Sequence, residues 1–256
     1  MADIKKATAV IKHREELSPG IYSMCLEEEE VAKSAKPGQF LSVYMKEGSR
    51  LLPRPISICE IDKEKGLLRI VYRVVGKGTM ELSEYAMGSK VEIMGPLGNG
   101  FMIGDEKSAI LIGGGIGIPP MLELAKQLTC KLSIVLGYRD ALFLADEFRP
   151  YGDVYIATED GSSGTKGNVI DAIKQNGLKA EIIFACGPTP MLRGVKTLAE
   201  HEQIPAQLSM EEKMACGIGA CLACVCKTKD KDHHTHVNNK RICKDGPVFY
   251  ADQIEL

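Results

Sequence analysis

Residues 216–224 read Cys-Gly-Ile-Gly-Ala-Cys-Leu-Ala-Cys, and a fourth cysteine, Cys243, stands apart further along the chain. This C-x4-C-x2-C…C spacing is typical of a plant-type [2Fe–2S] site. Gly217 and Gly219 let the backbone approach inorganic sulfide and point N–H groups at it, while the alanines keep side chains out of the way. The pattern predicts a loop wrapped around a rhombic cluster with four thiolate ligands: Cys216, Cys221, Cys224 and Cys243.

Zinc binding and free thiols are the alternatives for these cysteines. Structural zinc usually uses paired short spacings, whereas here three cysteines share one tight loop and the fourth is distant. Cys226 does not fit the ligand pattern and is expected to be a small buried hydrophobe. The histidine run at 233–236 lies in a polar stretch and is expected to form an exposed hairpin tip without a metal role.

The composition is that of an ordinary globular chain: 45% of the 256 residues are apolar and 26% are charged. The length suggests about two domains, with room for a small third. Because the 32 basic and 34 acidic residues nearly cancel and Trp is absent, we expect no nucleic-acid partner. No apolar run is long enough to span a bilayer, so no membrane association is expected.

Cysteine usage indicates the cellular compartment. The chain has nine cysteines, and the last five are concentrated between residues 216 and 243. The polar N-terminal residues show no signal segment, so the disulfide framework of a secreted protein is not expected. Clustered cysteines in such a chain are more often metal ligands, and we expect a cytoplasmic protein.

The first of three blocks, residues 1–103, reads as strands. Segments 40–45 and 67–74 are β-rich with partial alternation, and a short helical patch is expected at 79–85. Gly/Pro turns separate the strands. Many short strands joined in this way predict a small antiparallel β-barrel.

The second block, residues 104–208, alternates apolar strands with amphipathic helices. Strands are expected at 109–112, 132–136, 154–157 and 182–185, and helices at 121–128, 169–174 and 190–200. This βαβ alternation predicts a parallel α/β domain with helices on both faces of the sheet. The third block, 209–256, is too short for a large core, so a metal or cluster is expected to stabilise it.

Residues 113–120, Gly-Gly-Gly-Ile-Gly-Ile-Pro-Pro, follow a predicted strand and open a predicted helix. Glycines there allow close approach of a pyrophosphate to the backbone. The match to G-x-G-x-x-G/A fails because Pro120 occupies the last position. Cys186-Gly-Pro188 ends a later strand at the sheet edge where ligands bind. Each feature alone could be a plain turn, but together they predict a nucleotide site.

Two further segments lie in the barrel block, namely Arg54-Pro-Ile-Ser57 and Gly76-Lys-Gly-Thr79. Arg54 offers a bidentate fork for a phosphate, and Gly78-Thr79 opens the short helical patch, where an anion can bind. Ser57 offers a hydroxyl or a backbone N–H to a ring. Each segment taken alone would be read as a turn.

Together these features resemble the ferredoxin–NAD(P)+ reductase superfamily, in which R-P-x-S and G-x-G-T lie in a barrel and G-G-G-x-G-x-x-P and C-G-P lie in a sheet domain. With the cysteine module added, the whole chain is similar to the family of electron-transfer subunits of bacterial type 1B dihydroorotate dehydrogenases. The most specific stretches of this resemblance are 54–57, 94–100, 158–164, 214–221 and 243–249.

The resemblance implies that FAD, a [2Fe–2S] cluster and NAD bind to the chain. FAD would be held by Arg54, Pro55, Ile56, Ser57, Val71, Tyr72, Arg73, Gly78 and Thr79. The nicotinamide nucleotide would be bound by Gly113, Gly114, Gly115, Gly117 and Cys186. Ile56 stands where many reductases of the superfamily carry a tyrosine. Asp140 favours a free ribose hydroxyl and Arg139 could tolerate a phosphate, and the resemblance favours NAD.

The implied activity is electron transfer in pyrimidine biosynthesis. A partner subunit containing FMN would oxidise dihydroorotate, and electrons would pass through the cluster and FAD to NAD+. The implied assembly is a heterotetramer with two copies of each chain, and no side chain of this subunit needs to act as a catalytic acid or base. The alternatives are a subunit of another oxidoreductase with the same cofactors, such as a sulfide dehydrogenase or a transhydrogenase-type complex, and a non-enzymatic zinc-stabilised binding protein.

Overall fold

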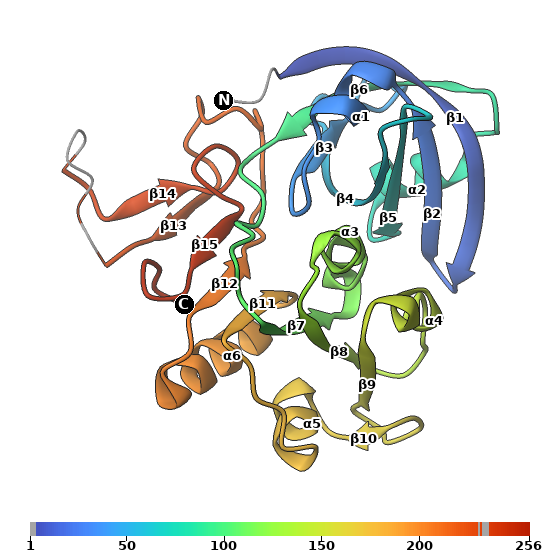
Figure 1. The fold of residues 1–256 in the computed structure, drawn as a ribbon. Coiled ribbons are helices and arrows are strands. Elements are labelled where there is room, and N and C mark those ends of the chain that lie inside the picture. Colours follow the sequence, from blue (N-terminus) through green and yellow to red (C-terminus); the bar gives the residue numbers. More distant parts are fainter. Residues whose placement is uncertain (1–3, 230, 232–235) are drawn as a thin grey trace.

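The computed structural model describes residues 4–229, 231 and 236–256, and it shows a barrel, an open sheet and a Cys-rich block beside both (Figure 1). The barrel is closed, with antiparallel strands in the order β1-β2-β5-β4-β3-β6. Its strands are β1 (Lys5–Ser18), β2 (Ile21–Glu27), β3 (Phe40–Val43), β4 (Arg54–Asp62), β5 (Leu67–Arg73) and β6 (Lys90–Leu97). Two short helices accompany it, α1 (Glu29–Ser34) and α2 (Lys77–Glu84). The predicted antiparallel barrel is confirmed.

Alternation along β5 shows how the barrel is held to its neighbour. Leu68, Ile70 and Tyr72 point into the barrel core. Val71, on the opposite face, belongs to a buried cluster that also contains Ala109 of the second sheet. Both faces of this strand are therefore buried, one by the barrel and one by the sheet domain.

The second sheet has seven strands in the order β10-β9-β8-β7-β11-β12-β15. Neighbours are parallel except for the last pair, β12 and β15. The strands are β7 (Ser108–Gly114), β8 (Lys131–Tyr138), β9 (Asp153–Thr158), β10 (Thr165–Lys166), β11 (Ile182–Cys186), β12 (Ala206–Ser209) and β15 (Val248–Tyr250). The four predicted strands are confirmed as β7, β8, β9 and β11.

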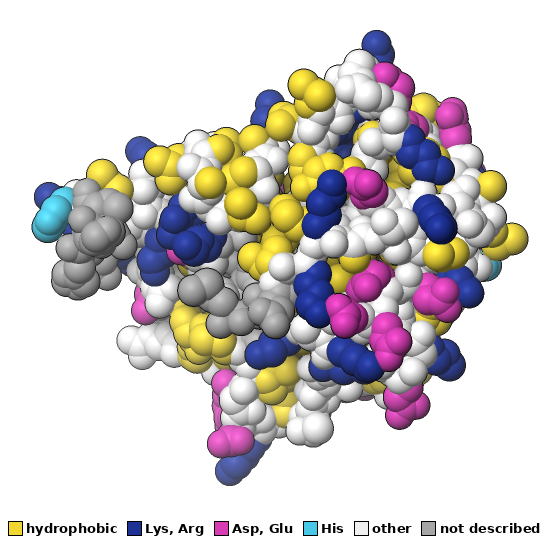
Figure 2. Space-filling view, turned by 90° about the horizontal axis from the view of Figure 1, so that it is seen from above, with side chains coloured by type: hydrophobic (Ala, Val, Ile, Leu, Met, Phe, Trp, Pro, Cys, Tyr) yellow, Lys and Arg dark blue, Asp and Glu magenta, His cyan; other side chains and the backbone are white. Residues whose placement is uncertain are grey.

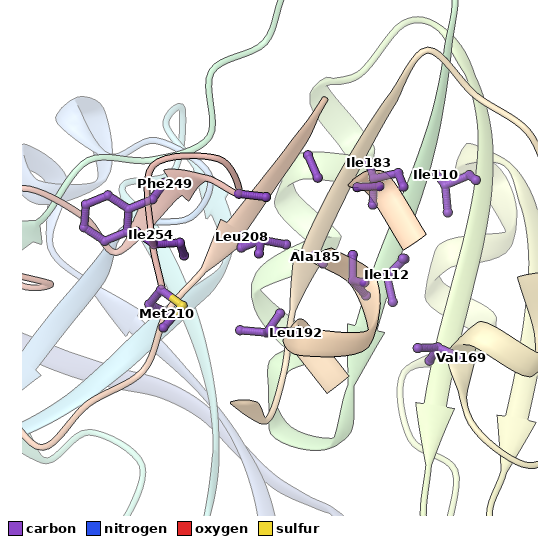
Figure 3. Packing of buried hydrophobic residues seen from close by; sticks show 14 of the residues in the cluster. Ile110, Ile112, Val169, Ile183, Ala185, Leu192, Leu208, Met210, Phe249 and Ile254 are labelled. Atoms are coloured by element: carbon purple, nitrogen blue, oxygen red, sulfur yellow. The ribbon is translucent and has the colours of Figure 1, made fainter. Parts of the chain in front are cut away.

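Helices cover both faces of this sheet, as predicted. They are α3 (Pro119–Gln127), α4 (Ala145–Phe148), α5 (Val169–Gln175) and α6 (Thr189–Glu202), with 3-10 turns η1 (Gly115–Gly117) and η2 (Arg149–Tyr151). Ile110 and Ile112 of β7 pack with α5 and α6 on one face (Figure 3). Leu111 packs with α3 and α4 on the other face. None of the helices in the described part of the chain is long and apolar enough to cross a membrane.

The Cys-rich block is joined to the larger sheet. Its own ribbon is a two-stranded sheet of β13 (Val225–Lys227) and β14 (Asn239–Arg241). Its last strand, β15, pairs antiparallel with β12, so that Phe249 and Leu208 are register partners. Cys224 and Cys243 are buried in the same apolar cluster as Phe249. The apolar side chains of the Cys-rich block are therefore buried against the sheet domain, because the block is too small to form a large core of its own.

A network of charges joins the barrel to the sheet domain. The Arg69 guanidinium on β5 donates to Glu60 Oε2 on β4 at 2.7 Å and also binds Glu147 on α4. Lys126 on α3 donates to Glu60 Oε1 at 3.2 Å. Glu123, also on α3, is buried and accepts the backbone N–H of Ile61 at 2.8 Å. These contacts fix how the barrel lies on the sheet.

Replacement of Glu60 by Gln tests this network. Burial raises the pKa of the Glu60 carboxyl, but the hydrogen bonds and charges of Arg69 and Lys126 outweigh it, so the pKa lies below its usual value. Such a carboxylate stabilises the fold above its unfolded pKa, about 4.3, and this contribution is lost as the pH falls through the folded value. In urea at pH 7 we expect Glu60→Gln to lose about 1–2 kcal/mol of unfolding free energy.

The difference in unfolding free energy between the wild type and Glu60→Gln should become smaller as the pH falls below about 4. Asp146→Asn is the control, because Asp146 pairs with Arg149 on the exposed surface of the sheet domain and its loss should change little. If the difference in unfolding free energy between the wild type and Glu60→Gln is the same at pH 3 and pH 7, the effect does not come from the Glu60 charge.

Candidate functional site

The carboxyl ends of β7 and β11 form the centre of the nucleotide-binding edge predicted from the sequence. The two strands are parallel neighbours, and Cys186 is the register partner of Gly113. From β7 the chain continues through β8, β9 and β10 on one side, then returns to β11 on the other. This reversal is the switch point at which ligands bind in open α/β sheets.

The glycines of the 113–117 turn are needed because this edge is tightly packed. A Cβ added to Gly117 would lie 2.5 Å from the carbonyl oxygen of Cys186, and one added to Gly114 would overlap the sulfur of Met191. Gly115 has φ +54°, the left-handed region that favours glycine. The structure therefore brings Gly113, Gly114, Gly115, Gly117 and Cys186 together.

The start of α3 differs from an ordinary phosphate-binding helix. Pro119 and Pro120 occupy its first two positions, and neither has a backbone N–H. Ile118 precedes them as N-cap without a side-chain hydrogen bond. The first turn of α3 therefore offers fewer backbone N–H donors than usual. The N–H groups of η1, within the glycine turn itself, are the donors that remain close to a bound phosphate.

Cys186 carries a neutral thiol at this edge. Burial raises its pKa to about 12, although a hydrogen bond with Ser209 acts in the opposite direction. A thiol with that pKa is not a nucleophile at neutral pH. It can contact an uncharged ring but cannot act as a reactive thiolate.

The predicted flavin segments meet at the N-terminal end of α2. The Arg54 guanidinium lies directly over Gly78, so that a Cβ on Gly78 would overlap it. Arg54 also donates to the carbonyl of Leu52. Thr79 Oγ1 accepts the N–H groups of Val75 at 3.0 Å and Gly76 at 3.2 Å and so closes the turn before α2. A guanidinium fork beside a glycine-lined helix start is a cradle that fits a diphosphate.

The remaining predicted flavin residues point in different directions. Ile56 and Tyr72 place their side chains in the barrel core, where the Tyr72 ring stacks on Tyr22 with centroids 6.1 Å apart. Burial raises the pKa of Tyr72. Pro55 and Arg73 are exposed, and β5 contacts η1. The flavin segment and the glycine turn are therefore neighbours, and Ile56 and Tyr72 offer mainly backbone to a ligand.

The cysteine loop brings its ligand candidates together in two pairs. Cys216 Sγ accepts the N–H groups of Ala220 at 3.3 Å and Cys221 at 3.4 Å. Burial acts to raise the pKa of Cys216, but hydrogen bonds from Ile218, Cys221 and Ala220 lower it to about 6. N–H donors aimed at sulfur are what a ligand thiolate requires.

The second pair is Cys224 and Cys243. Cys224 Sγ accepts the N–H of Cys243 at 3.4 Å. Burial, followed by the contact with Cys224, raises the pKa of Cys243 to about 12. Among the described residues, no three His, Cys, Asp or Glu side chains converge as ligands of one metal ion would. Two neighbouring pairs suit a binuclear centre better than a single zinc ion.

The cysteine loop packs on the outside of the barrel. A Cβ on Gly217 would lie 2.8 Å from Ser42 Oγ on β3 and 3.3 Å from Leu97 on β6. Asn99 donates its side-chain N–H groups to the carbonyls of Lys244 and Asp245, both at 3.2 Å. Sequence reasoning did not single out Ser42 or Asn99 as site residues, because these contacts join segments far apart in the chain.

Two further predictions for the Cys-rich block concern Cys226 and the histidine run at 233–236. Cys226 is buried on β13, as expected. Most of the histidine run, residues 233–235, lies outside the described residues. His236 is described and exposed, with φ +58°.

Comparisons with known proteins agree with this geometry. Residues 211–255 match the model of the iron–sulfur cluster binding domain of dihydroorotate dehydrogenase B. Residues 8–101 match the oxidoreductase FAD-binding domain. Electron transfer subunits of dihydroorotate dehydrogenase B (NAD(+)) from Bacillus velezensis and Fusobacterium nucleatum are 41% and 40% identical, and each match covers 99% of this chain and 100% of the relative.

Solved structures show the same architecture. A chain of an NADH-dependent reduced ferredoxin–NADP oxidoreductase superposes with a TM-score of 0.88 at 30% identity, covering 97% of this chain and 90% of that one. Phthalate dioxygenase reductase superposes with a TM-score of 0.61 at 17% identity, covering 98% and 96%. The second likeness shows the fold alone.

The contact between Gly117 and the Cys186 backbone yields a stability prediction. Because backbone atoms cannot move aside cheaply, we expect Gly117→Ala to lose about 1–3 kcal/mol of unfolding free energy, measured in urea. Gly48→Ala is the matched control, since a Cβ there meets nothing within 4 Å. If both variants unfold at the same urea concentration, the close approach at Gly117 is not a constraint on the fold.

Proposed function

Because the chain belongs to the family of electron transfer subunits of dihydroorotate dehydrogenase B (NAD(+)), we propose that it carries electrons from a dihydroorotate-oxidising catalytic subunit to NAD+. The observation that carries this proposal is the presence, in one chain, of two cysteine pairs beside the barrel, an Arg54–Gly78 cradle and a glycine turn at a sheet switch point. These three sites suit a cluster, a flavin nucleotide and a nicotinamide nucleotide.

FAD is the proposed ligand of the barrel cradle. When bound, FAD exchanges two electrons with a nicotinamide and single electrons with an iron–sulfur cluster. Arg54 binds the diphosphate, with Gly78 leaving room for the Arg54 guanidinium and Thr79 holding the turn. Pro55 and Ser57 face the flavin from β4, Val71 and Arg73 lie along β5, and Ile56 and Tyr72 contribute backbone.

The four cysteines Cys216, Cys221, Cys224 and Cys243 are the proposed ligands of a [2Fe–2S] cluster. Each pair binds one iron, and backbone N–H groups of the loop stabilise the ligand thiolates. Cys216 is half-buried and Cys221 is exposed, whereas Cys224 and Cys243 are buried, so the first pair forms the more exposed end of the proposed site.

NAD is the proposed nucleotide at the carboxyl edge of the sheet. Gly113, Gly114, Gly115 and Gly117 form the turn on which it lies. A Cβ on Gly115 would meet nothing within 4 Å, so the nucleotide approaches the backbone there, whereas the other three glycines let the turn pack closely. The neutral Cys186 thiol lies beside the nicotinamide. Asp140 follows β8, next along the sheet, and is exposed. Its carboxylate can accept hydrogen bonds from a ribose diol, which favours NAD over its 2′-phosphorylated form.

The substrate chemistry belongs to the partner in this proposal. Hydride transfer between stacked rings needs close positioning rather than a side-chain acid or base, so no residue of this chain is assigned a catalytic role. We further propose that two copies of each chain form a heterotetramer with an FMN-containing subunit. A cytoplasmic location is proposed because the cysteines are free thiols, four of them grouped as ligand candidates, rather than a disulfide framework.

Activity of the isolated chain tests the division of labour. Purified with its flavin and iron, it should reduce ferricyanide with NADH but should not oxidise dihydroorotate. Addition of the FMN-containing subunit should restore dihydroorotate-dependent reduction of NAD+, followed by absorbance at 340 nm, the usual NADH wavelength.

Oxidation of dihydroorotate by this chain alone would refute the two-subunit assignment. Electron acceptance from another donor protein, with none from the dihydroorotate-oxidising subunit, would favour the sulfide dehydrogenase or transhydrogenase-type alternative. A colourless preparation with one zinc per chain would support the binding-protein alternative.

Gly78→Ala tests the FAD cradle. Alanine is the better helix former, so we expect no loss of fold, but its Cβ must displace the Arg54 guanidinium. FAD should therefore bind about tenfold more weakly, a loss of about 1.4 kcal/mol, as measured by flavin fluorescence on dilution. Gly76→Ala is the matched control, because a Cβ there meets nothing within 4 Å. If the two variants bind FAD with equal affinity, Arg54 does not bind FAD.

A further inference from the structure

The backbone of Gly219 is a point where the segment that carries Cys243 holds the cysteine loop. Gly219 lies between Cys216 and Cys221 in the loop, with φ +82°. Its carbonyl accepts a hydrogen bond from Arg241 Nη1 at 3.3 Å. The loop with one cysteine pair is thus tied to the segment that carries Cys243.

Arg241 also closes the turn that carries Cys243. Its guanidinium forms a fork on Asp245, with Nε to Oδ2 at 2.9 Å and Nη2 to Oδ1 at 3.0 Å. Its backbone N–H donates to Asp245 Oδ2 at 2.8 Å, and the N–H of Asp245 donates to the Arg241 carbonyl at 2.7 Å. Bidentate pairs of this kind fix geometry as well as adding energy.

The loop itself has little regular structure to hold its shape. Gly217 and Leu222 have φ of +70° and +57°, and no helix or strand lies between β12 and β13. Leu222 is a non-glycine residue in the left-handed region, which costs energy. The loop packs directly on the Cys243 turn, since a Cβ on Gly219 would lie 2.7 Å from Lys244 Cδ. Its conformation therefore depends on contacts from outside.

We propose that Arg241 is a positioning residue of the cluster site, which binds Asp245 and the Gly219 carbonyl together and so holds the cysteine loop against the turn that carries Cys243. This inference rests on the proposed function. Arg241 acts through the Gly219 carbonyl and the turn. Residues that contact the segments carrying the metal ligands, rather than the metal itself, orient those ligands and tune the metal centre.

Arg241→Met is the direct test, made in the full chain with its flavin and iron. Methionine keeps the apolar stem and removes the fork. We expect iron release to a ferrous chelator to become about 10–100-fold faster. We also expect a shifted midpoint potential in an anaerobic titration followed by electron paramagnetic resonance, because the loop and the Cys243 turn are then no longer held in one geometry.

Asp245→Asn is the second variant, because it removes the other half of the fork. It should also speed iron release, and the double variant should release iron no faster than the faster single variant, since both break the same contact. Arg241→Lys should recover only part of the wild-type behaviour, because an ammonium cannot form the fork. Arg149→Met, which breaks the exposed pair with Asp146, is the matched control and should match the wild type.

Wild-type iron release and midpoint potential in Arg241→Met would overturn the inference while leaving the proposed function intact. Loss of FAD together with iron in Arg241→Met would also overturn it, because Arg241 would then support the fold rather than the cluster site. Absence of an iron–sulfur cluster from the wild-type chain would overturn the proposed function and this inference together.

Discussion

One strand, β3, sets the spacing between the flavin segment and the cysteine loop. Ser42 of β3 is the register partner of Pro55 on one side and of Met94 on the other. Its hydroxyl faces Gly217, where any side chain would collide with it. Neighbouring strands lie about 4.8 Å apart, so the width of a single strand separates the two sites. A glycine at 217 is what lets the loop lie against the barrel, and a larger residue would push the cysteines outward.

The other contacts keep that spacing by tying the Cys-rich block to both domains. Asn99 holds the Cys243 turn from the barrel side, and β15 joins it to the sheet through β12. Arg69 and Glu123 hold the barrel against α3 and α4. The charge network is half-buried, which makes its geometry more important than its net energy. The three predicted ligand sites thereby share one connected set of strands and helices, although they come from three segments of the chain.

Local patterns in the sequence were sufficient to predict what depends on neighbouring residues. The buried strand at 109–112 and the glycine turn after it appear in the structure where the pattern placed them, and the four cysteines lie in two neighbouring pairs. Side-chain direction on the barrel strands was not predictable. Register shifts interrupt the alternation, as between Ile58 and Glu60, so that Ile61 rather than Glu60 faces the barrel core after Ile56 and Ile58. The pairing of β15 and the Arg241 contacts join residues distant in sequence, and no local pattern encodes them.

Backbone, more than side-chain chemistry, forms the predicted nucleotide edge, which supports the proposal that no acid or base acts there. Gly117 lies against the Cys186 backbone, and the first turn of α3 carries two prolines instead of capping side chains. Cys186, at the centre of this edge, is kept neutral by burial. Such an edge is built to orient a ring by shape rather than to exchange a proton with it. In the proposed function, the choice of the substrate that is oxidised then belongs to the electron-donating subunit, because this edge serves the nucleotide.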